Sequence, residues 1–185
     1  MPSREMKTVA KTGLGKSLFA SWRFSDIGTD KEKLNPEFVL NKAEYQCTSI
    51  LLTGRNMGCG SSREFAVWAL VDFGIQAIIA PSFGAIFFTN CIRNGLLPIV
   101  LDEQVIASLA EYVALDPQIN QLDIDLKNCQ VTGSAGTVYP FELQSGFQIM
   151  LLEGLDAIDI TKKLDKKIDA FKTTDIHKRP WAYLN

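Results

Sequence analysis

Residues 49–73 read SILLTGRNMGCGSSREFAVWALVDF, and this stretch decides the fold. Its opening run, Ser49 to Thr53, has the length and apolar composition of a buried strand. Three glycines then punctuate residues 54–60, which is typical of a loop that comes close to a ligand or to another backbone. From Phe65 the apolar residues recur at helical spacing, and Gly74 is a natural stop. The stretch therefore predicts a strand, a glycine loop and a helix in direct succession.

The junction between the loop and the helix carries the polar side chains Ser61, Ser62, Arg63 and Glu64. Ser61 and Glu64 have the spacing of a capping box, which predicts that the helix begins at Ser61. The unpaired N–H groups and the dipole of such a helix start attract an anion. Arg63 would lie in the first turn, where its positive charge is unfavourable for the helix. Its planar guanidinium group, however, is suited to bind a carboxylate through two hydrogen bonds. The spacing alone leaves two interpretations open, an anion site or a capped helix with a surface arginine.

The chain then continues the alternation of strands and helices. Residues 76–80 and 97–101 are predicted to be strands. Between and after them, Ser82 and Asp102 are predicted to cap helices that run to Arg93 and Leu115. The order β-α-β-α-β favours parallel pairing with right-handed crossovers.

The residue composition and pattern differ on either side of this β-α-β-α-β unit. Residues 1–41 are polar and predict an arm with a helical turn or two. Residues 122–126 and 137–143 alternate apolar and polar side chains around a glycine-rich turn, which predicts an antiparallel hairpin. Two helices are expected at 145–153 and 162–171. A chain of 185 residues with these elements is expected to form one domain of the α/β class.

Composition narrows the class of function. The net charge of −2 provides no basic excess for a phosphate backbone, so we expect no nucleic-acid partner. The most apolar stretch, residues 74–88, is interrupted by polar residues and proline, and the first ten residues are charged. We therefore expect no membrane span, no secretory signal and a cytoplasmic location. The four cysteines form no C-x-x-C pair, so we expect reduced thiols and no metal site of the chain's own.

Three local patterns imitate known sites. Residues 10–17, AKTGLGKS, resemble a phosphate-binding loop, but the first glycine is replaced by alanine and the preceding residues are a poor strand. The order around Ser61 does not match a nucleophile elbow, and the single histidine, His177, lies in a polar tail. Cys59 has no histidine placed as its base, so we expect a small, tightly packed loop residue instead.

Four motifs occur in order along the chain: NMGCGSSRE at 56–64, WAL at 68–70, IAPSF at 79–83 and NGLLPI at 94–99. In these motifs the chain resembles the small subunit of 3-isopropylmalate dehydratase, an aconitase-superfamily enzyme of leucine biosynthesis. Shorter matches at Trp22-Arg23 and at residues 36–40 extend the similarity over nearly the whole chain.

The resemblance implies a swivelling β/β/α domain of the aconitase C-terminal type, with a mixed sheet flanked by helices. It implies a large subunit as partner, which carries a [4Fe-4S] cluster, and a small hydroxy-dicarboxylate substrate. The reaction would be a dehydration and rehydration that interconverts 2-isopropylmalate and 3-isopropylmalate. By similarity, Ser61 would be the catalytic general base, while Ser62 and Arg63 would bind a substrate carboxylate.

The chain departs from the family pattern in three places. Phe65 stands where the family usually has histidine, and Ala85 stands where it usually has aspartate. Family members also normally begin with a further strand and an acidic loop before the position of Pro2, so residues 1–185 are expected to form the swivel domain without that strand. A related hydro-lyase small subunit, acting on homoaconitate or a methyl-substituted malate, and a non-catalytic binding domain both stay open as alternatives.

Overall fold

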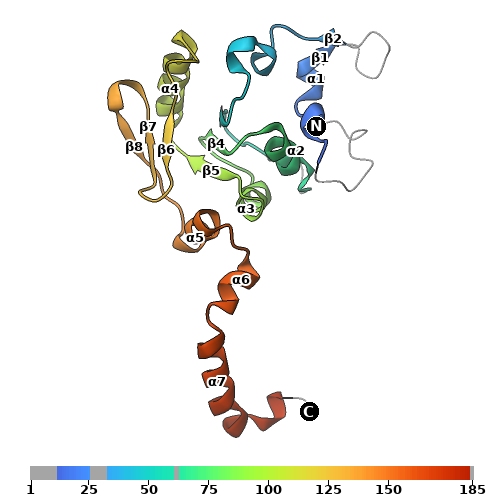
Figure 1. Cartoon of the computed structure of the whole chain (residues 1–185), viewed down its shortest axis with the longest axis vertical. Helices are drawn as coiled ribbons and strands as arrows, with labels where there is room; N and C mark the ends of the chain where they lie inside the picture. Colours follow the sequence, from blue (N-terminus) through green and yellow to red (C-terminus); the bar gives the residue numbers. More distant parts are fainter. Residues whose placement is uncertain (1–11, 26–32, 61–62, 184–185) are drawn as a thin grey trace.

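Figure 1 shows the computed structural model of the chain, which describes residues 12–25, 33–60 and 63–183. At its centre is a sheet in the order β3-β4-β5, and both strand pairs run parallel. Its strands are β3 (Ile50–Leu52), β4 (Ala77–Ala80) and β5 (Leu97–Val100). The predicted strands, their parallel pairing and the α/β class are therefore confirmed.

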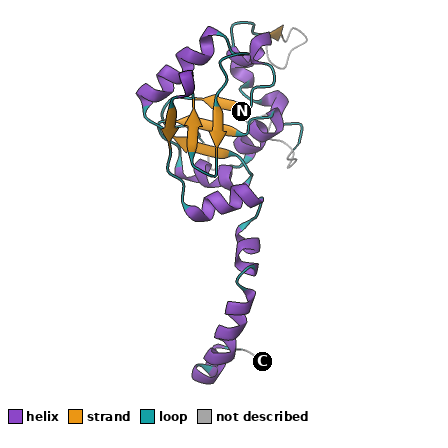
Figure 2. Ribbon diagram, turned by 60° about the vertical axis from the view of Figure 1, so that its left-hand side comes forward, coloured by secondary structure: helices purple, strands orange, loops and turns teal. Residues whose placement is uncertain are grey.

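The parallel sheet is the middle layer of the body because apolar side chains cover both of its faces. Along β4, Ile78 packs in one core cluster and Ile79 in another, as the alternation of a strand requires. The first cluster joins the sheet to α2 (Phe65–Phe73) and α3 (Ala85–Arg93), and the second joins it to α4 (Glu103–Leu115). Burial on both faces explains why β4 is a continuous apolar run. Figure 2 shows the strands gathered at the centre with helices outside them.

A second sheet, with antiparallel pairing in the order β6-β7-β8, covers the second cluster. Its strands are β6 (Asp123–Asp125), β7 (Gln130–Thr132) and β8 (Val138–Pro140). The predicted hairpin paired the first of these with the last, and this pairing is wrong. Each of them pairs with β7 instead, whose Val131 is fully buried in the core. Residues 130–132 carry a single apolar side chain, Val131, so no alternation in the sequence marks β7.

The N-terminal segment packs against α2 through the 3-10 turn η2 (Gly15–Ser17). The short elements α1 (Ala20–Arg23), β1 (Phe24–Ser25) and β2 (Lys33–Leu34) follow it along the chain. Gly15, from the pattern that imitates a phosphate loop, donates its N–H to Asp72 Oδ2 at 2.7 Å. A Cβ on Gly15 would lie 2.8 Å from the backbone nitrogen of Phe73. This glycine therefore allows close packing against the end of α2, which accounts for it without a nucleotide.

The chain ends in an arm. Helix α5 (Ser145–Glu153) lies beside α3, whereas α6 (Ala157–Lys162) and α7 (Asp165–Lys178) run away from the body (Figures 1 and 2). The predicted helix at 162–171 is thus too short, and α6 precedes it. Of the helices in the described part of the chain, none has the length and apolarity to cross a bilayer.

Candidate active site

The glycine loop (residues 53–60) leaves the carboxyl end of β3 and is bound to the loop that follows β4. The N–H of Met57 donates to the carbonyl of Ser82 at 3.0 Å, and the N–H of Gly84 donates to the carbonyl of Met57 at 2.9 Å. The Ser82 hydroxyl oxygen accepts the N–H of Asn56 at 2.9 Å. Parallel α/β sheets bind ligands outside the carboxyl ends of their strands. The loop therefore lies at the edge of the sheet where a site is expected.

Gly58 permits the close approach of this loop to α3. Its φ is +78°, a conformation that side chains other than glycine rarely adopt. A Cβ at this position would lie 2.0 Å from Cγ of Phe87, whose ring is buried in the first core cluster. Only a residue without a side chain fits between the loop backbone and that ring.

Of the three predicted site residues, the structure describes Arg63. Ser61 and Ser62 lie outside the described residues. Arg63 is exposed and precedes α2, which begins at Phe65 with Glu64 in the N-cap position. The predicted helix start at Ser61 is therefore wrong, and Arg63 stands before the helix and not in its first turn. Its guanidinium and the positive end of the α2 dipole remain close along the chain, so the local field favours an anion.

Glu64 makes no side-chain cap, because its carboxylate has another partner. Its Oε1 accepts from the Asn94 amide at 3.3 Å, and Oδ1 of Asn94 accepts from Nε1 of Trp68 at 3.0 Å. The Asn94 amide also donates to the carbonyl of Asn90 at 2.8 Å. These bonds tie the start of α2 to the end of α3. No local signal in the sequence points to these partners of Asn94, because they lie 26 and 30 residues away along the chain.

The other two predicted caps differ in outcome. Helix α3 begins at Ala85 with Gly84 as its N-cap residue, so Ser82 is not a cap. The Ser82 hydroxyl instead accepts a hydrogen bond from Asn56 in the glycine loop. Asp102 occupies the N-cap position of α4 as predicted, but its side chain accepts no cap hydrogen bond.

A cavity of about 570 Å³ opens beside Arg63 and is called here the Arg63 cavity. Met57 and Gly60 from the glycine loop line it, together with Phe65 from α2 and an aromatic pair from the α1 region. The loop, the start of α2 and the N-terminal segment thus meet at one hollow. It is the natural place for a small ligand whose anionic group binds Arg63.

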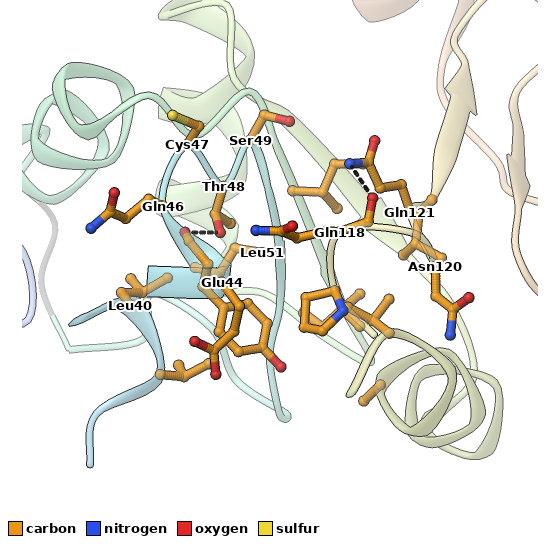
Figure 3. A pocket seen from close by; sticks show the side chains of 18 residues that line it. Leu40, Glu44, Gln46, Cys47, Thr48, Ser49, Leu51, Gln118, Asn120 and Gln121 are labelled. Carbon is orange, nitrogen blue, oxygen red and sulfur yellow. Dashed lines mark hydrogen bonds between the residues drawn. The ribbon is translucent and has the colours of Figure 1, made fainter. Parts of the chain in front are cut away.

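A second cavity, of about 580 Å³, lies between β3, the segment before it and the chain that follows α4 (Figure 3). Its polar lining consists mainly of amide and hydroxyl side chains, with Glu44 as the carboxylate. One side of its wall is fixed by the Thr48 hydroxyl, which donates to the carbonyl of Tyr45 at 2.6 Å. Its lining includes neither Arg63 nor any histidine. The Arg63 cavity is therefore the better candidate.

The described residues include no group of three or more His, Cys, Asp or Glu side chains that could hold a metal ion. Cys47 and Cys59 are exposed, so the expectation that Cys59 is tightly packed is wrong. Cys91 is buried, and burial raises the pKa of its thiol to about 12. The residues described do not form a cluster site within this chain.

Comparison with known proteins identifies the family. The model of the aconitase C-terminal domain matches residues 1–104. A 3-isopropylmalate dehydratase small subunit from Cupriavidus necator is 52% identical over 100% of this chain and 88% of that relative. The corresponding subunit from Rhodospirillum centenum is 43% identical over 98% of this chain and 87% of that relative. A solved 3-isopropylmalate dehydratase structure from Methanocaldococcus jannaschii is 30% identical, with a TM-score of 0.48 over 66% of this chain and 68% of that one.

Both of these small-subunit matches extend over almost the full chain. The chain belongs to the aconitase C-terminal domain family and, within it, to the small subunits of 3-isopropylmalate dehydratase.

Proposed function

We propose that this chain is the small subunit of a hydro-lyase that interconverts 2-isopropylmalate and 3-isopropylmalate in leucine biosynthesis. The observation that carries the proposal is the 52% identity, over the whole chain, to a protein named as that small subunit. The name also implies a large subunit, with which this chain would form the working enzyme. We propose that residues 1–185 act within it as one swivelling domain.

Three residues at the start of α2 would act on the substrate. Ser61 would remove the proton from the substrate carbon, while Ser62 and Arg63 would hold a carboxylate. A serine hydroxyl is a very weak base, so Ser61 could act only where neighbouring N–H groups and positive charge stabilise its alkoxide. The glycine loop and the positive end of α2 support such an environment. The Arg63 guanidinium would bind the carboxylate through two parallel hydrogen bonds.

The large subunit would hold the [4Fe-4S] cluster, which supplies Lewis acidity for the departing hydroxyl. The described residues of this chain offer no ligand group for a cluster. Catalysis would therefore need both subunits: one for the cluster, and this chain for the base and the carboxylate anchor.

Substitution of Ser61 by alanine tests the assignment in the enzyme reconstituted with its large subunit. Loss of a general base should lower turnover of 3-isopropylmalate by at least roughly 10²-fold. Stability should change little, because Glu64, and not Ser61, occupies the N-cap position of α2. Ser108→Ala, an exposed serine on α4, is the matched control and should leave both quantities unchanged. Near-normal turnover of Ser61→Ala would show that Ser61 is not the base.

A further inference from the structure

The Arg63 cavity has few polar lining residues and a largely apolar wall. Arg63 provides its charged side chain and Ser21 a hydroxyl, while the remaining lining is aliphatic, aromatic or glycine. Its volume of about 570 Å³ lies within the range of small-molecule sites, about 300–1,000 Å³. The ligand that fits best therefore has an anionic group for the arginine and an apolar substituent for the rest of the hollow.

The apolar wall is built from two parts of the chain. Phe19 and Trp22 stack with ring centroids 5.8 Å apart and an interplanar angle of 8°. Phe65, at the start of α2, packs on Trp68 with centroids 5.1 Å apart. Both Phe19 and Phe65 pack against the first core cluster, as does Met57 from the glycine loop. The core thus supports Phe19, Phe65 and Met57 from behind.

The position of Trp22 differs from that of the other wall residues. Its side chain is 64% exposed although it lines the cavity, so it stands at the mouth. An exposed tryptophan at the mouth of a cavity that an arginine also lines is suited to a ligand that enters with its apolar end against the ring. Trp22 can also be replaced with little effect on the core.

We propose that the Arg63 cavity is the subsite for the apolar branch of the substrate, with Trp22 and Phe65 as specificity-determining residues. This inference rests on the proposed function. A substrate whose carboxylate binds Arg63 would place its isopropyl group against the aromatic wall, where burial of apolar surface is favourable. A third carboxylate in place of that group would lose its hydration without gaining a partner. The wall therefore selects an alkyl malate over a tricarboxylate, and a larger alkyl branch over a methyl group.

The test compares substrates in the reconstituted two-subunit enzyme. The measured quantity is kcat/KM for 3-isopropylmalate divided by kcat/KM for a methyl-substituted malate. One methylene in an apolar pocket is worth about 10- to 200-fold in such ratios. Trp22→Ala and Phe65→Leu should each lower the ratio by at least roughly tenfold, because the longer branch loses its wall while the methyl group does not reach it.

Matched controls separate selectivity from stability. Trp181 is 77% exposed on the turn after α7, and Phe88 is half-buried against Phe147, and neither lines the cavity. Trp181→Ala and Phe88→Leu should leave the ratio unchanged. If Phe65→Leu fails to fold, the exposed Trp22 variant still decides the outcome.

The outcomes distinguish failure of the proposed subsite from failure of the proposed function. An unchanged ratio in Trp22→Ala and Phe65→Leu, with an active wild-type enzyme, would overturn the subsite and leave the proposed function standing. A wild-type complex that turns over a tricarboxylate more efficiently than 3-isopropylmalate would overturn both.

Discussion

Replacement of Gly58 by alanine tests whether contact with α3 holds the glycine loop in place. The φ of +78° costs a residue with a side chain about 1–2 kcal/mol. The added Cβ would lie 2.0 Å from Cγ of Phe87 and 2.5 Å from its Cβ, so the ring must move. That ring is only 3% exposed, and overpacking a core costs about 1–3 kcal/mol. Gly58→Ala should therefore lower the free energy of unfolding by about 2–5 kcal/mol.

Urea unfolding of the isolated chain, followed by tryptophan fluorescence and circular dichroism, measures this loss. Gly54→Ala is the matched control in the same loop, because its φ is not positive and no atom lies within 4 Å of the added Cβ. It should change stability by no more than about 0.5 kcal/mol.

A double-mutant cycle with Phe87→Ala isolates the contact itself. Removal of the ring relieves the clash, so the double variant should be more stable than the sum of the single losses predicts, by at least about 1 kcal/mol. A loss below about 1 kcal/mol for Gly58→Ala, or strict additivity with Phe87→Ala, would refute the argument that the ring sets the loop.

The remaining predictions concern the site and the thiols. Arg63→Lys should raise the Michaelis constant for 3-isopropylmalate in the reconstituted enzyme, because a point donor replaces a bidentate fork, and an unchanged constant would place Arg63 outside the site. In the native chain at pH 8, iodoacetamide should label Cys47 and Cys59 but not Cys91. The Cys91 pKa of about 12 leaves a thiolate fraction of about one in ten thousand, and peptide mass spectrometry would detect a labelled Cys91. Ser82→Ala removes the acceptor of the Asn56 N–H and should speed amide hydrogen exchange there, while exchange along β4 stays unchanged.

The hydrogen bonds between the two loops explain how the site is supported. Met57 is bonded to both Ser82 and Gly84, and the loop after β4 leads directly into α3. A substitution at the start of α3 therefore affects the glycine loop through these hydrogen bonds. Neither Gly84 nor Ala85 lines the Arg63 cavity itself. The departure from the family pattern at Ala85 lies in this supporting position.

Several features follow from the sequence alone because their physical causes are local. The apolar run before the glycine loop, the helical spacing after it and Gly74 predict a strand, a loop and a helix in that order. The repeat of that pattern through Leu101 determines parallel pairing, since short connections allow few other topologies. The motif around Arg63 likewise indicates the family without reference to any tertiary contact.

Other features were decided by tertiary structure because they depend on residues far apart in the chain. The helix starts at Phe65, not at Ser61, and the Glu64 carboxylate bonds to Asn94 across 30 residues in place of a local N–H. Strand β7 forms because Val131 completes a core that also contains side chains from β4, β5 and α4. The Arg63 cavity exists because folding brings Trp22 to the start of α2. Periodicity and capping rules depend on residues that are close in sequence. These three outcomes depend instead on residues that are distant in sequence and close in the folded structure.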